Sequence, residues 1–86
     1  IEAKAKAEIA RRISSIINHR HLKQAEAADL LGIDQPKISR LMRGQLKDFS
    51  LERLMIFAMR LDRDVQIILS KKPRSRKEST LTVAAV

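Results

Sequence analysis

The chain lacks cysteine entirely, and its 86 residues include only two glycines and two prolines. Without cysteine the protein can form neither disulfides nor thiolate metal sites, and an intracellular, cytoplasmic location fits this composition. Gly32 and Gly44 stand alone, so no glycine-rich loop is present that could cradle a phosphate. These absences exclude disulfide scaffolds, thiolate metal domains and enzymes that depend on such a loop.

Long apolar runs are also absent from the sequence. No run approaches the roughly 20 residues that a membrane-spanning helix needs, so we expect no insertion into a membrane. The amino end, IEAKAKAEIARR, is charged throughout and lacks the apolar core of a signal peptide. Because the chain opens with Ile1 and not with methionine, we expect it to be a fragment whose natural start is missing.

Groups suited to catalysis or metal binding are scarce. Ser, His and Asp residues occur without any spacing that suggests a catalytic triad. His19 and His21 are two positions apart, so on a helix they would face different directions, and no third ligand is nearby. We interpret them as surface histidines at the end of a helix. The sequence therefore predicts a protein that is not an enzyme and holds neither a metal nor another cofactor.

Positive charge is what the chain has in excess. It carries 18 Lys and Arg against 10 Asp and Glu, a formal charge of +8, and a sequence pI near 10.7. Such an excess favours polyanionic partners, nucleic acid first and an anionic membrane surface second, with a merely soluble basic surface as the alternative. The length fits one small domain, which buries roughly 60% of the surface of its unfolded chain.

Residues 24–43, QAEAADLLGIDQPKISRLMR, predict two short helices joined by a tight turn. Gly32 can adopt the left-handed conformation that ends a helix without a Cβ clash. Asp34 suits the N-cap of the next helix, and Pro36 lies in its first turn, where a missing N–H costs nothing. Apolar residues recur at helical spacing around the turn, first Ala25, Ala28 and Leu31, then Ile38, Leu41 and Met42. The pattern is typical of a helix-turn-helix motif.

Helices are predicted on both sides of this motif. One covers about residues 2–20, where a single buried stripe consists of Ile9, Ile13, Ile16 and Ile17. Its first turns are rich in Ala and Lys and could project from the body, as a dimer contact or a flexible extension. After the loop GQLKDF, Ser50 suits the N-cap of a further helix, LERLMIFAMRL. Phe49 is predicted to pack against the core as a hydrophobic staple for that helix.

The carboxyl end predicts a change from helix to strand. VQIIL, residues 65–69, is rich in β-branched residues, and TLTVAAV, residues 80–86, is a second strand candidate. The basic run SKKPRSRKES between them contains Pro73 and indicates a loop, so the strands could pair as a hairpin; a disordered tail after Ser70 is the alternative. A lone ribbon with apolar residues on both faces needs cover. The helix LERLMIFAMRL could cover one face, and a second copy of the chain could cover the other or extend the sheet at its edge, which predicts a homodimer.

The second helix of the motif has one polar and basic face. On a helical wheel, Ile38, Leu41 and Met42 point inward, whereas Pro36, Ser39, Arg40 and Arg43 point outward, with Lys37 on a flank and Gln35 at the amino end. Because Gln can bond bidentately to adenine and Arg to guanine, Gln35 and Arg40 are predicted to contact base edges. Lys37 and Ser39 are further candidates, and phosphate contacts are predicted for Arg43, Lys23 and Gln24. An ordinary solvated helix face is the alternative.

The segment QAEAADLLGIDQPKISRLMRG resembles the helix-turn-helix of the Cro and lambda-repressor class, the XRE family. Its continuation, GQLKDFSLERLMIFAMRLDRDVQIIL, resembles a branch with HigA-type antitoxins and related small regulators. The resemblance implies a mainly α, four- to five-helix, lambda-repressor-like fold. It also implies a phosphate contact by Gln24 and recognition-helix roles for Gln35, Pro36, Lys37 and Arg40. The strand-like VQIIL replaces the fifth helix of the lambda repressor, which favours a strand-mediated dimer contact.

These observations predict a helix-turn-helix DNA-binding domain in residues 1–63 and a strand or hairpin extension in residues 64–86 that mediates dimerisation. The predicted function is that of a homodimeric, sequence-specific transcriptional regulator, a repressor, on a near-palindromic stretch of double-stranded DNA. The alternative is an antitoxin that neutralises a toxin protein and represses its own operon. A third interpretation is non-specific binding of nucleic acid or membrane by the basic run at residues 71–77.

Overall fold

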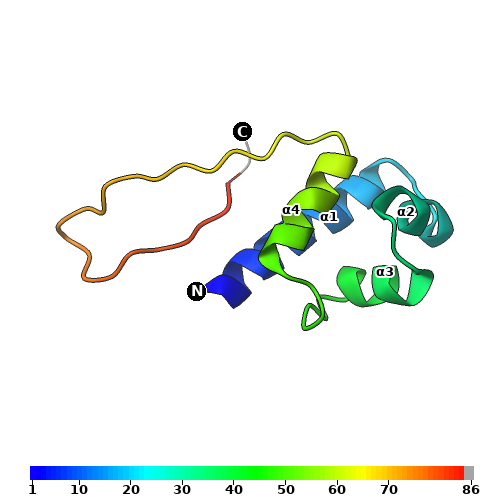
Figure 1. Cartoon of the computed structure of the whole chain (residues 1–86), viewed down its shortest axis with the longest axis horizontal. Coiled ribbons are helices and arrows are strands. Elements are labelled where there is room, and N and C mark those ends of the chain that lie inside the picture. Colours follow the sequence, from blue (N-terminus) through cyan, green and yellow to red (C-terminus); the bar gives the residue numbers. More distant parts are fainter. Residues whose placement is uncertain (85–86) are drawn as a thin grey trace.

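The computed structural model describes residues 1–84 and has four helices in that range. They are α1 (Glu2–His19), α2 (Gln24–Leu31), α3 (Gln35–Met42) and α4 (Leu51–Arg60). The mainly α fold predicted from the sequence is therefore confirmed, with four helices in the described residues and not five. Figure 1 shows these helices gathered at one end of the molecule, with a long excursion of the chain at the other end.

The long helix α1 packs against both α4 and α3, while α2 packs against α3 and α4. The isoleucine stripe of α1 faces this core: Ile13 and Ile17 are buried, and Ile9 and Ile16 pack against the buried cluster. Ala5, in the second turn of α1, is only 2% exposed, so the amino end of this helix also contacts the rest of the molecule. The small Ala side chain allows that close approach.

The loop between α3 and α4 is fastened by an aromatic pair. Phe49 is buried directly before α4, as predicted, and its ring meets that of Phe57 edge to face, with centroids 6.0 Å apart. Ser50 caps α4, since its Oγ accepts the amide N–H of Arg53 at 3.0 Å. The edge-to-face geometry adds roughly 0.5–1.5 kcal/mol to the burial of the two rings, so this loop is held firmly between α3 and α4.

The predicted carboxyl-terminal strands and hairpin are wrong for the described residues, in which no strand forms. After α4, residues 62–84, which we call the arm, run outward in an extended conformation, bend, and return toward the body (Figure 1). Ile67, Ile68 and Leu69 are 75%, 77% and 95% exposed. Within residues 1–84 no layer covers these aliphatic side chains, and an uncovered two-stranded ribbon is marginal in water. The last residues of the second predicted strand, 85–86, lie outside the described residues.

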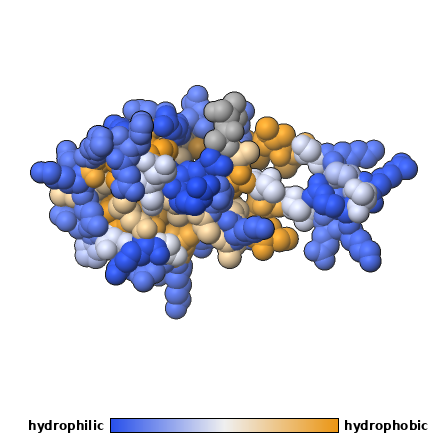
Figure 2. Space-filling model, turned by 180° about the vertical axis from the view of Figure 1, so that it is seen from behind, coloured by the Kyte–Doolittle hydropathy of each residue, from blue (hydrophilic) through white to orange (hydrophobic). Residues whose placement is uncertain are grey.

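The arm has two chemically distinct parts. Apolar side chains occupy the stretch nearest the body, and Figure 2 shows them as patches between the helical body and a hydrophilic far end. That far end is the basic run at residues 71–77, which we call the tip. None of the helices in residues 1–84 is long and apolar enough to cross a membrane.

Candidate nucleic-acid interface

The turn between α2 and α3 depends on Gly32. Its φ of +71° lies in the left-handed region, which L side chains rarely adopt, and it ends α2 as predicted. The Gly32 amide donates to the Asp29 carbonyl at 3.2 Å, and the Ile33 amide donates to the Ala28 carbonyl at 3.0 Å. A Cβ at position 32 would also lie 2.5 Å from Nη1 of Arg60. Gly32 is therefore required by the backbone conformation, and a Cβ there would displace the end of the flexible Arg60 side chain.

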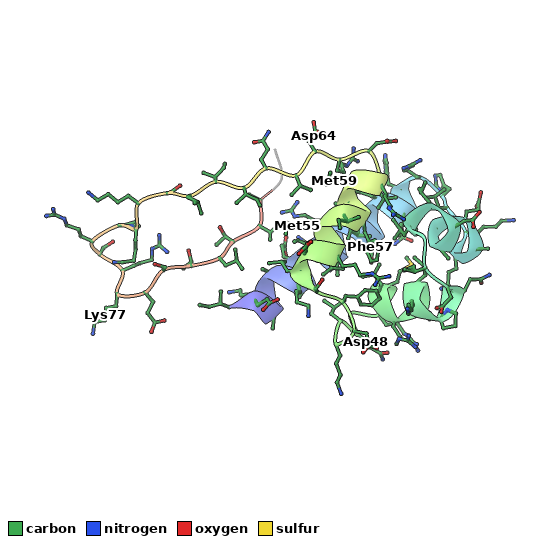
Figure 3. The ribbon with its side chains drawn as sticks, viewed as in Figure 1. Asp48, Met55, Phe57, Met59, Asp64 and Lys77 are labelled. Atoms are coloured by element: carbon green, nitrogen blue, oxygen red, sulfur yellow. The ribbon has the colours of Figure 1, made fainter. Side chains whose placement is uncertain are left out.

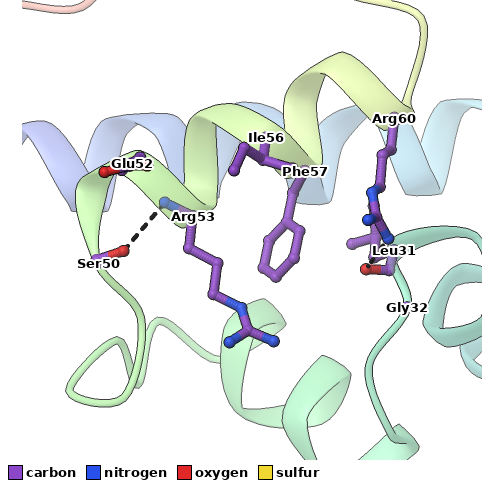
Figure 4. A pocket seen from close by; sticks show the side chains of 8 residues that line it. All are labelled: Leu31, Gly32, Ser50, Glu52, Arg53, Ile56, Phe57 and Arg60. Carbon is purple, nitrogen blue, oxygen red and sulfur yellow. Dashed lines mark hydrogen bonds between the residues drawn. The ribbon is translucent and has the colours of Figure 1, made fainter.

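That neighbour, Arg60, was missed by the sequence-based reasoning. It is the last residue of α4, and its Nη1 donates to the Leu31 carbonyl at the end of α2, at 3.0 Å (Figure 4). The free carbonyls at the end of a helix carry partial negative charge, so a guanidinium is a favourable partner there. Because 29 positions separate the two residues, no local pattern could have predicted this contact. Arg60 ties the helix-turn-helix turn to α4 and hence to the base of the arm.

The amino end of α3 is set by Asp34, as predicted. Asp34 has an extended backbone, and its Oδ1 accepts the amide N–H of Lys37 at 2.9 Å. Pro36 occupies the first turn of the helix. A side-chain cap of this type stabilises a helix by about 1 kcal/mol. In a helix of eight residues the cap fixes where the outward face begins.

The two sides of α3 differ sharply in burial. Ile38 and Leu41 are completely buried in the core, and Met42 packs against it. On the opposite side, the predicted DNA-binding residues are either exposed (Gln35, Pro36 and Arg43) or half-buried (Lys37, Ser39 and Arg40). The structure thus brings five predicted residues onto one short helix, with Arg43 directly after it, and the other side of the helix is locked in the core.

Arg40 is less free than the helical wheel suggests. Its Nε is buried and has no hydrogen-bond partner in the part of the chain that the structure describes. The aliphatic stem of an arginine can cover apolar surface while its terminal nitrogens reach outward. Arg43 is constrained differently, because its Nε donates to the Ser39 carbonyl at 3.3 Å. Both side chains are partly ordered before any partner arrives.

The predicted phosphate-contacting residues Lys23 and Gln24 lie at the amino end of α2, and both are exposed. Gln24 is the first residue of the helix, and Lys23 precedes it. The Lys23 amide donates to Oε1 of Glu26 at 2.9 Å, which fixes the entry into α2. The first amides of a helix and a lysine side chain together suit a phosphate group.

The cations of this surface have no carboxylate partners. In residues 1–84 the ion pairs involve only Glu8, whose carboxylate lies 2.6 Å from Arg11 and 3.1 Å from Arg12 on α1. The hydrogen bond from Arg11 lowers the pKa of Glu8 below its ordinary value. Lys23, Lys37 and Arg43 therefore contribute uncompensated positive charge. No group of three or more metal-binding side chains occurs within the described range.

Comparison with known proteins agrees with this geometry. Residues 2–70 match the family described as a helix-turn-helix domain. A solved structure titled "Putative XRE Family Transcriptional Regulator" is 44% identical, covers 99% of this chain and 96% of its own, and superposes with a TM-score of 0.94. No curated protein matches the chain. The family match covers all of the described helices and the beginning of the arm, and the solved structure covers nearly the whole chain.

Proposed function

This chain belongs to the XRE family of DNA-binding, helix-turn-helix transcriptional regulators, and we propose that it acts as a homodimeric repressor on a near-palindromic operator. The observation that carries the proposal is the two-sided construction of α3. Its inner residues are locked in the core, while its outer residues offer hydrogen-bonding and cationic groups. A rigid helix with such a face fits the major groove.

Each side chain of the site has a proposed role. Gln35 and Arg40 contact base edges in the major groove, and Lys37 and Ser39 add contacts on the same face. Pro36 packs close to the groove wall at the amino end of α3. Phosphates are held at the rim of the groove by Lys23, Gln24 and Arg43. The half-buried Arg40 supports a base-reading role, because a side chain with little remaining freedom loses less entropy on binding.

The apolar surface beside the helix-turn-helix supports dimerisation. Ile56 and Met59 of α4 are exposed, and the arm continues this apolar character through Ile67, Ile68 and Leu69. Burying apolar surface contributes roughly 25 cal/mol per Å², so contiguous exposed aliphatic residues favour association with a partner. A second copy would place two α3 helices on successive major grooves, roughly 34 Å apart, and occupancy of a promoter would repress transcription.

The test is to select bound DNA from a random pool at near-physiological salt and then measure Arg40→Ala on the selected operator. We expect a loss of about 1–3 kcal/mol and a relaxed preference at one base pair in each half-site. Arg63→Ala, at the base of the arm and away from α3, is the control and should bind like the wild type. An equal loss on selected and random duplexes would show that Arg40 contacts only phosphate and would contradict the base-reading role.

The antitoxin function remains the second candidate. The exposed aliphatic residues of the arm would also suit a toxin protein, which would be neutralised there while α3 stays free to repress the operon. The formal charge of +8 disfavours a basic toxin through long-range electrostatics. Co-expression with a small toxin from a neighbouring reading frame tests this function. Unrelieved toxicity would count against it, whereas growth restored by the wild type but not by an Ile67→Asp, Leu69→Asp variant would support it.

A further inference from the structure

The tip of the arm is a folded turn and not a featureless run of charge. The Arg76 amide donates to the Pro73 carbonyl at 3.2 Å, closing a tight turn. The Lys72 ammonium donates to the carbonyls of both Pro73 and Arg76, so it spans the turn from one side. The Arg76 Nη1 then donates to Oγ1 of Thr80 at 2.8 Å. Lys72 and Arg76 hold the turn, which leaves the other cations to point into solvent.

The tip concentrates positive charge without compensation. Five cations lie within residues 71–77, namely Lys71, Lys72, Arg74, Arg76 and Lys77, and the nearest carboxylate in sequence is Glu78. All except Lys72 are exposed. None takes part in an ion pair in the described part of the chain, where only Glu8 forms them. Like charges held this close repel one another, and a polyanion relieves that repulsion.

The tip and α3 lie at opposite ends of the molecule (Figure 1). The Cα extents are 47 × 25 × 18 Å, and the arm runs along the longest of these axes (Figure 1). In Figure 3, Lys77 lies on the same lower side of the view as α3, and the molecule is only 18 Å deep in that direction of view. The longest extent, 47 Å, exceeds the roughly 34 Å of one turn of B-DNA. A duplex that runs along this axis must therefore be longer than one turn to meet both α3 and the tip.

We propose that the tip is a second DNA-binding site, which holds phosphates outside the half-site that α3 contacts. This inference rests on the proposed DNA-binding function of α3. The tip presents ammonium and guanidinium groups without the rigid helix needed to read base edges, so it adds affinity and salt dependence but no base preference. A membrane surface is the competing polyanion, but the structure has no amphipathic helix beside the tip in the described residues.

The test is a triple variant, Lys71→Gln, Arg74→Gln and Lys77→Gln, which spares the residues that hold the turn. Binding constants are measured between low and near-physiological salt on the selected operator and on a random duplex. Each phosphate contact contributes about 0.9 to the slope of log K against log salt, so we expect the slope to fall by about 2–3 on both duplexes. The ratio of the two affinities should stay at the wild-type value.

The control is Arg63→Gln, which removes one cation from the opposite end of the arm and should leave the slope unchanged. Unchanged slopes in the triple variant would overturn the proposal. The proposal would also be overturned if the slope fell and sedimentation showed that the triple variant no longer forms the dimer. A third contrary result is a triple variant that binds DNA like the wild type but no longer binds vesicles with anionic lipid. A wild type that selects no preferred sequence would contradict the function proposed for α3, whereas a reduced slope in the triple variant would still support the tip.

Discussion

Residues 24–42 and residues 62–84 are similar in length, and both contain aliphatic residues at regular spacing. In the first region Ile38 is 0% exposed, because α1 and α2 pack over α3. In the second region Leu69 is 95% exposed, because no other element covers it. The same kind of side chain therefore stabilises the fold in the helix-turn-helix and is left exposed in the arm. Within the described residues, the helix-turn-helix buries its aliphatic side chains, and the arm leaves most of its own exposed.

The largest expected effect contrasts one isoleucine from each region. Ile38→Ala removes a fully buried side chain and should lower the free energy of unfolding by about 2–5 kcal/mol. Ile67→Ala removes an exposed one and should change the same quantity by less than about 0.5 kcal/mol. Urea denaturation of both variants measures this, at a concentration low enough for monomers to dominate. Equal losses would mean that the arm is packed against the body of its own chain.

The second effect concerns the turn that begins the recognition helix. Gly32→Ala must adopt a left-handed backbone and displace the Arg60 guanidinium from the Leu31 carbonyl, so it should lower the free energy of unfolding by about 2–3 kcal/mol. Gly44→Ala is the matched control, since its φ is +76° but no atom lies within 4 Å of the added Cβ. It should cost about 1 kcal/mol, from the backbone alone. Thermal or urea unfolding gives both numbers, and equal costs would contradict the close contact.

The smallest effect tests the link between the turn and α4. Arg60→Ala removes the exposed guanidinium that donates to the Leu31 carbonyl and should cost about 1 kcal/mol. In this background Gly32→Ala should cost no more than Gly44→Ala, because the neighbour of the new Cβ is gone. A double-mutant cycle from urea denaturation measures the coupling. Full additivity would show that Arg60 does not restrain the turn.

The local features of the recognition helix could be predicted from the sequence. Gly32 as a helix stop and Asp34 as an N-cap each act within one turn of their own position, so neighbouring residues carry the necessary information. The burial of Ile38 and Leu41 followed from their spacing. Interactions that close over three or four residues leave a signature that periodicity reveals.

Other features depend on distant partners, and here the sequence was insufficient. The contact of Arg60 with Leu31 depends on how α4 crosses the end of α2, which no local pattern encodes. Arg40 is half-buried, which a helical wheel of α3 alone does not reveal. In the described residues, the strands predicted at 65–69 and 80–86 were wrong because β-branched spacing indicates a side chain suited to burial, not the presence of a layer that buries it.

The spacing of half-sites selected from random DNA tests the central claim, that the helix-turn-helix reads DNA alone and the arm supplies the second copy. The wild type and an Ile67→Asp, Leu69→Asp variant are compared in the same selection. We predict two inverted half-sites about 34 Å apart for the wild type and one isolated half-site, with the same bases, for the variant. A paired operator selected by the variant, or a single half-site selected by the wild type, would contradict the account.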